Sequence, residues 1–173
     1  MTVVGLDFAK LSLRDALDLA VLVEEEARDR YRELAEQLTL HHTPEAAAFF
    51  GRMARIEERH RQQLLSRRHL EFDDEPTVIS RCMIYDIEAP EYDEARAFMS
   101  LRQAFEAALR AETKAHDFYR DIANAASDPK TAELFRELQE EEVDHRTLVQ
   151  AELSKLPPHE GSEDAYSDDP QAL

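Results

Sequence analysis

Residues 24–32 read EEEARDRYR, and the same pattern of Glu, Ala, Asp, Tyr and Arg returns as ETKAHDFYR at residues 112–120. A second segment, FGRMARIEERHR at residues 50–61, returns as FRELQEEEVDHR at residues 135–146 with Phe, Glu, His and Arg in register. In both pairs the second copy follows the first by nearly the same number of residues. Self-similarity of this kind indicates two copies of one supersecondary unit, and we expect that unit to be a helical hairpin.

Caps and breaks along the chain predict four helices. Ser12 begins the first, with Asp15 in a Ser-x-x-Asp arrangement similar to a capping box. Thr43 and Pro44 suit the cap and first turn of the second, and the Ser127-Asp128 pair caps the fourth. The predicted helices are residues 12–40, residues 44–69, a third from Asp93 or Ser100 to Ala126, and residues 129–156.

The segment between the second and third helices is predicted to be a long crossover. Residues 70–92 contain two prolines, an acidic run and the β-branched pair Val78-Ile79. Short links within each helix pair and one long link between the pairs are typical of an all-α, ferritin-like four-helix bundle. We expect this bundle to occupy residues 1–156, and the acidic, apolar-poor residues 157–173 to form a disordered tail.

Composition supports a single acidic helical domain. The 173 residues include only three glycines and no tryptophan, and they carry 38 acidic against 21 basic side chains for a formal charge of -17. That charge repels nucleic acid and anionic membranes and attracts small cations. Cys82 is the only cysteine, which excludes a disulfide framework or a Cys-x-x-Cys metal site within these residues. With no leader-like segment and no long apolar run, we expect a cytoplasmic protein.

Charged residues interrupt the apolar stripe of every predicted helix. In the first helix the stripe runs through Ala20 and Val21 to Glu24, and in the third it runs through Ala108 and Leu109 to Glu112. The second and fourth helices carry Glu-x-x-His pairs at the same level, and side chains three residues apart lie on one helical face. These pairs are Glu57 with His60 and Glu142 with His145.

The six intruding side chains predict a site for two metal ions. An ionised carboxylate in an apolar core is costly unless it is paired or coordinates a metal, and four carboxylates meet only two imidazoles here. Two divalent cations would neutralise the cluster, a ligand set known from di-iron and di-manganese bundles. We expect each histidine to supply one nitrogen, Glu24 and Glu112 to be terminal ligands, and Glu57 and Glu142 to bridge. Interhelical ion pairs are the alternative interpretation of the same residues.

Several other polar residues lie near the predicted site. Tyr31 and Tyr119 follow Glu24 and Glu112 by two helical turns, and we interpret them as candidate catalytic side chains that hydrogen-bond the bridging carboxylates. The alternative is that they are core aromatics. His116 is a possible accessory ligand. A set of neighbouring glutamates is expected on the solvated face: Glu25, Glu26, Glu58, Glu140 and Glu141.

The motifs Glu24-x-x-Ala27-Arg28-x-Arg30-Tyr31, Glu57-x-x-His60, Glu112-x6-Tyr119 and Glu142-x-x-His145 resemble the rubrerythrin branch of the ferritin-like superfamily. The resemblance covers most of residues 12–156. It implies a non-haem di-iron centre that reacts with O2 or H2O2, in a ferroxidase or peroxide-detoxifying role, and frequently a homodimer or larger homo-oligomer. Manganese accepts the same oxygen and nitrogen ligands as iron.

The chain departs from the rubrerythrin pattern at two points. Full-length rubrerythrins carry a cysteine-ligated rubredoxin domain, which a segment with only Cys82 cannot form, so an external electron donor is implied. Rubrerythrin peroxidases also use an extra carboxylate at the position of Ala115. The remaining six-ligand set is more similar to the ferroxidase centre of ferritin or bacterioferritin.

Two other functions share the same motifs. The demethoxyubiquinone hydroxylases have paired Glu-x-x-His helices but need an apolar outer face to meet a membrane quinone, and the charge of -17 argues against one. Iron binding or storage without turnover is the non-enzymatic alternative. A di-iron oxidoreductase is the function that the sequence favours.

Overall fold

The structure is a computed structural model and describes residues 6–40, 43–84, 87, 90 and 99–157. These residues contain four α-helices, two short 3-10 helices and no strand. The elements are η1 (Phe8–Lys10), α1 (Leu13–Leu40), α2 (Pro44–Phe72), η2 (Arg81–Met83), α3 (Leu101–Ala125) and α4 (Pro129–Ser154). The all-α prediction is confirmed for this part of the chain.

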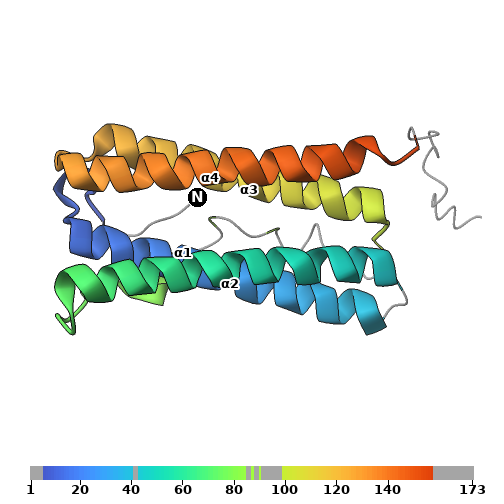
Figure 1. Ribbon diagram of the computed structural model, residues 1–173, viewed down its shortest axis with the longest axis horizontal. Coiled ribbons are helices and arrows are strands. Elements are labelled where there is room, and N and C mark those ends of the chain that lie inside the picture. Colours follow the sequence, from blue (N-terminus) through green and yellow to red (C-terminus); the bar gives the residue numbers. More distant parts are fainter. Residues whose placement is uncertain (1–5, 41–42, 85–86, 88–89, 91–98, 158–173) are drawn as a thin grey trace, which may run out of the picture.

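The helices form two hairpins that lie against each other. α1 packs along α2, and α3 packs along α4. Figure 1 shows α1 and α4 running in one direction and α2 and α3 in the other. Because α2 ends at Phe72 and α3 begins at Leu101, the connection between the hairpins is long, as predicted. This is the ferritin-like arrangement.

Side-chain caps account for most of the helix starts. The Ser12 hydroxyl accepts a hydrogen bond from the Asp15 amide at 3.2 Å and donates to the Asp15 carboxylate at 2.7 Å. Ser100 forms a capping box with Gln103, so α3 begins after Ser100 and the alternative start at Asp93 lies outside the described residues. Asp128 accepts from the Thr131 amide at 2.9 Å at the start of α4.

Two helix ends differ from the sequence-based expectation. Thr43 precedes α2 as predicted, but its hydroxyl donates to the Leu38 carbonyl at 3.0 Å instead of capping α2, because its ψ of 68° is not the extended conformation of a cap. α2 continues beyond His69 to Phe72, where Asp73 with a positive φ of 48° ends it. Phe72 packs on the core, which favours the extra turn.

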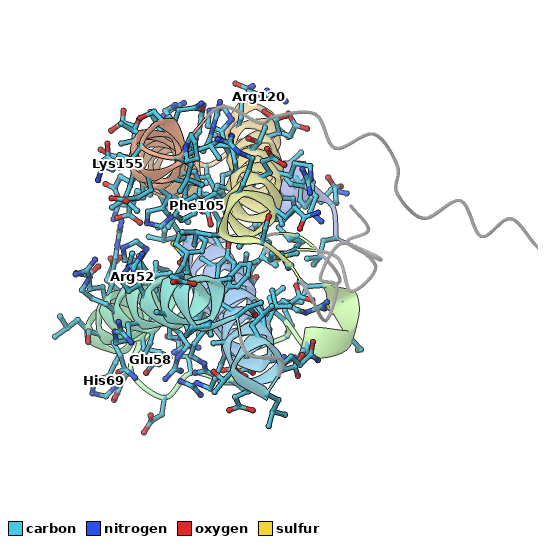
Figure 2. All side chains as sticks on the ribbon, turned by 90° about the vertical axis from the view of Figure 1, so that its right-hand side faces the viewer. Arg52, Glu58, His69, Phe105, Arg120 and Lys155 are labelled. Carbon is cyan, nitrogen blue, oxygen red and sulfur yellow. The ribbon has the colours of Figure 1, made fainter. Side chains whose placement is uncertain are left out.

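The apolar core consists of two clusters along the bundle. One contains Leu17, Tyr119 and Phe135, and the other contains Tyr31 and Phe50. Between them, all four helices carry charged side chains in place of apolar ones. In the view along the bundle, Figure 2 places Phe105 between the helices and Arg120, Glu58 and His69 on the outside.

The ends of the described chain bear on two further expectations. α4 ends at Ser154, two residues before the predicted end, and Arg102 donates to the Pro157 carbonyl at 2.5 Å. The predicted disordered tail is otherwise outside the described residues. Among the helices described here, none has an apolar run that would cross a bilayer.

Candidate metal centre

The six predicted ligands lie together in one buried layer between the two apolar clusters. α1 contributes Glu24, α3 contributes Glu112, and all four ligand glutamates and His145 are buried. The stripe positions that the sequence singled out therefore do face the interior. α2 and α4 contribute the two Glu-x-x-His pairs, Glu57 with His60 and Glu142 with His145.

The first half of the layer is grouped around His60. Its Nδ1 atom lies 3.9 Å from Glu24 Oε2 and 3.9 Å from Glu57 Oε2. These separations are too long for hydrogen bonds. The His60 nitrogen thus faces one carboxylate from α1 and one from α2 at a distance that leaves both within reach of a common ion.

The second half is grouped around His145 and is tighter. Its Nδ1 atom lies 3.1 Å from Glu112 Oε2 in a hydrogen bond and 3.5 Å from Glu142 Oε2. The rings of His60 and His145 stack with centroids 4.9 Å apart and planes within 10°. The two halves are therefore adjacent, as a pair of neighbouring ions would require.

The two tyrosines connect the halves across the bundle. Tyr31 on α1 donates to Glu112 Oε1 at 2.5 Å, and Tyr119 on α3 donates to Glu24 Oε1 at 3.4 Å. We expected the tyrosines to hydrogen-bond the predicted bridging glutamates. Both bonds go instead to Glu24 and Glu112, which the sequence analysis assigned as terminal ligands. The reason is geometric: helical side chains tilt toward the N-terminus, so each hydroxyl reaches back to the layer and meets the glutamate of the facing helix.

The two equivalent glutamates have different protonation behaviour. Burial raises the pKa of Glu24 to about 8, and the nearby carboxylates of Glu141 and Glu112 add to the rise. Burial also opposes ionisation of Glu112, but the hydrogen bond and charge of His145 and the bond from Tyr31 outweigh it and lower the pKa of Glu112. Without metal at neutral pH, Glu24 is largely protonated and Glu112 is ionised.

The two histidines differ in the same way. Burial and the neighbouring charge of His145 lower the pKa of His60 to about 4, so its ring is neutral at pH 7. Burial works against protonation of His145, but its hydrogen bond to Glu112 and the surrounding carboxylates raise its pKa. A neutral imidazole is the form that binds a metal ion, and His60 is already in that form.

Two buried atoms of the layer indicate that the residues fit a cation. Glu24 Oε2 and His60 Nδ1 make no hydrogen bond within the described part of the chain. An unsatisfied buried polar atom costs about 1–3 kcal/mol. Bonds of about 2 Å to nitrogen and oxygen, as for zinc, would let one ion contact both atoms across their 3.9 Å gap. Carboxylates and imidazoles together suit iron or manganese.

The remaining polar residues near the motif fall outside the layer, with one exception. His116 contacts Asp117 through Nδ1 and Gln139 through Nε2, both at 3.1 Å, so the accessory-ligand interpretation finds no support. Glu140 is exposed, and Glu25, Glu26 and Glu58 are partly exposed. The exception is Glu141, whose Oε2 lies 3.9 Å from His60 Nδ1.

The sequence predicts Glu141 on the solvated face, and its side chain is indeed 44% exposed, but its Oε2 atom also reaches the edge of the layer. A signal for this second contact was present, since Glu141 precedes His145 by one helical turn and so shares a face with it. A second residue that the sequence did not single out as buried is Arg30, which donates to the Pro90 carbonyl at 3.3 Å and ties α1 to the long connection.

Comparison with known proteins agrees with this architecture. A sequence model of the rubrerythrin family matches residues 15–153 and residues 103–167. A crystal structure of an uncharacterized conserved protein from Magnetospirillum magnetotacticum MS-1 is similar, with a TM-score of 0.67 and 25% identity over 84% of this chain and 96% of that chain. A search of curated proteins finds no match. The ferritin-like fold and the resemblance to rubrerythrin are thereby confirmed.

Proposed function

We propose that this chain, which belongs to the rubrerythrin family, is a non-haem di-iron oxidoreductase that binds two ferrous ions in the buried layer and oxidises them with O2 or H2O2. The observation that carries the proposal is the placement of six donor side chains from four helices in one layer. Within it, Glu24 Oε2 and His60 Nδ1 lack hydrogen-bond partners in the described residues.

The six donors form two groups that meet at His145, which lies close to Glu57 and His60 as well as to Glu112 and Glu142. Glu24, Glu57 and His60 would hold one ion, while Glu112, Glu142 and His145 would hold the other. A bound iron pair supplies two electrons to O2 or H2O2. The four carboxylates offset the positive charge of two divalent ions in a site that excludes water.

Protons must leave the layer when metal binds. At neutral pH Glu24, with a pKa of about 8, holds a proton in the metal-free protein, and the hydrogen bond to Glu112 raises the pKa of His145 and so favours its protonated form. Because ligands bind in their deprotonated forms, metal uptake displaces those protons. Tyr31 acts as a positioning residue, since its hydroxyl fixes one oxygen of Glu112 and leaves the other facing His145.

The chain lacks one feature of the rubrerythrin peroxidases. The position of their extra carboxylate is Ala115, which is fully buried and provides no oxygen ligand. This supports a six-ligand centre of the ferroxidase kind. Repeated turnover then requires an external electron donor.

Anaerobic titration with ferrous ion tests the proposal. The wild-type chain should saturate near two ions per chain, whereas Glu57→Ala should lose at least one of them, and Glu140→Ala, which removes an exposed glutamate, should bind as the wild type does. Admission of O2 or H2O2 should then produce ferric absorbance. Failure of the wild type to bind iron, or wild-type binding by Glu57→Ala, would overturn the proposal.

Turnover separates an enzyme from a storage protein. With a chemical reductant present, an oxidoreductase consumes oxidant far beyond one equivalent per loaded site. A storage protein consumes a single equivalent and retains the ferric product. Parallel titration with Mn²⁺ determines whether the layer prefers iron.

A further inference from the structure

Glu141 connects the buried layer with the solvent. Its side chain is 44% exposed, yet its Oε2 atom lies 3.9 Å from Nδ1 of His60. By contrast, the four ligand glutamates have side chains at most 2% exposed. Glu141 therefore reaches both the bulk water and a ligand atom of the layer.

We propose that Glu141 is the uptake residue of the metal centre: it binds a divalent cation arriving from solvent and passes it to His60 and Glu24. This inference rests on the proposed function, because it assumes that the layer holds metal. Glu141 would be a seventh carboxylate or imidazole group at the site. It would speed the binding of the ions without being one of their final ligands.

The position of His60 shows where a cation would enter the layer. His60 and His145 are the most exposed of the six donors, at 11% and 10% of their side chains, and their rings stack side by side. His60 Nδ1 lies 3.9 Å from Glu141 Oε2 and 3.9 Å from Glu24 Oε2. The ring nitrogen thus stands between a half-exposed carboxylate and a buried one.

An acidic side chain near a histidine would not by itself indicate a ligand, but the neighbouring atoms do. Glu24 is almost completely buried, and its Oε2 has no hydrogen-bond partner in the described residues. His60 Nδ1 is likewise without a partner there. Because His60 Nδ1 lies 3.9 Å from both Glu141 Oε2 and Glu24 Oε2, a cation released by Glu141 would first meet two ligand atoms that make no hydrogen bond within the described residues.

The charges around Glu141 also favour a cation. No arginine or lysine of the described residues forms an ion pair with Glu141, whereas the adjacent Glu137 is held by Arg67 at 2.7 Å. The positive charge of His145 acts against a cation here, whereas Glu137 and Asp144 add negative charge beside Glu141. On the facing helix α2, the charge of Arg59 acts on His60 and is a second opposing influence. A carboxylate left unpaired in a negative field raises the local concentration of cations.

Stopped-flow mixing of the metal-free full chain with Co²⁺ tests the proposal, with the visible absorbance of bound cobalt as the readout. Glu141→Gln should slow binding by about ten-fold while the final stoichiometry stays at the wild-type value. The matched control is Glu140→Gln, which removes the same charge one residue away and should change the rate by less than about two-fold. Glu141→Asp restores a carboxylate and should recover much of the rate.

The outcomes separate this inference from the proposed function. Equal rates in Glu141→Gln and Glu140→Gln would overturn the uptake role while leaving the metal centre intact. Loss of a bound cobalt in Glu141→Gln would also overturn it, because Glu141 would then be a permanent ligand. A wild-type chain that takes up no cobalt would refute the metal centre itself.

Discussion

Replacing Tyr31 by phenylalanine removes one hydroxyl from the centre of the bundle and should destabilise the metal-free protein measurably. The hydroxyl donates to ionised Glu112 at 2.5 Å, and both side chains are fully buried. A hydrogen bond to a charged group contributes about 1.5–3 kcal/mol, and the phenyl ring itself stays in place. We therefore expect Tyr31→Phe to lower the free energy of unfolding by about that amount.

The internal repeat provides a matched control in Tyr119→Phe. Tyr119 is equally buried, but its hydroxyl lies 3.4 Å from Glu24, whose pKa of about 8 keeps it largely protonated at neutral pH. A long bond to a neutral partner contributes at most about 1 kcal/mol. Urea unfolding at pH 7 with metal removed measures the free energy of unfolding of both variants. The dependence of that free energy on urea concentration should match the wild type.

The same pair of variants also reports on metal binding. Loss of the Tyr31 hydrogen bond raises the pKa of Glu112, because that bond helps to lower it. Removing a partner that orients a ligand typically reduces metal affinity about 10–100-fold, and we expect this for Tyr31→Phe in equilibrium titration with Co²⁺. Equal losses of stability in the two variants, or a loss below about 0.5 kcal/mol in Tyr31→Phe, would refute the reasoning from hydrogen-bond length and charge.

Two further predictions concern pH and metal. The raised pKa of Glu24, about 8 against 4.5 when unfolded, gives stability that is fully present below pH 4.5 and is lost as pH rises through 8. Urea unfolding of the metal-free protein should therefore show a loss of free energy of unfolding on the order of 1–2 kcal/mol between about pH 6.5 and pH 8. The raised pKa of His145 acts in the same direction, and the lowered pKa of His60 gives the opposite slope only below pH 6.5. Glu24→Gln should lose most of this dependence of stability on pH. An unchanged dependence would contradict the raised pKa of Glu24. Added Co²⁺ should raise the unfolding temperature, by an amount equivalent to about 2.7 kcal/mol at a hundred times the dissociation constant, and a chelator should reverse it; an unfolding temperature insensitive to cobalt would contradict metal binding in the layer.

The helices and the ligand layer were predictable from the sequence because they depend on local periodicity. Glu24 and Glu112 interrupt apolar stripes at equivalent positions of a repeat, and this marks them as inward-facing without knowledge of the packing. Ser100 was one of the two predicted starts of α3, and its capping box with Gln103 makes it the cap of the helix that begins at Leu101. The extra turn of α2 to Phe72 did not, because it depends on the contact of Phe72 with the core.

Features that depend on which helices face each other were not predictable. Tyr31 bonds Glu112, 81 positions away, and that pairing exists only once α1 and α3 are placed opposite each other. The repeat suggests equivalent halves, but the structure makes them unequal, since His145 contacts Glu112 at 3.1 Å whereas His60 lies 3.9 Å from Glu24. The opposite pKa shifts of Glu24 and Glu112 arise from that difference.

The division of the core into two apolar clusters has a consequence for the lifetime of the protein. Each end of the bundle is stabilised by apolar contacts, whereas the layer between them depends on a few hydrogen bonds among buried polar groups and contains atoms without a hydrogen-bond partner in the described residues. In the metal-free protein we therefore expect local opening, and the first proteolytic cleavage, at the level of this polar layer. If the proposed ions bind, their bonds to all four helices would join the two apolar clusters, so resistance to proteolysis would rise with the supply of metal.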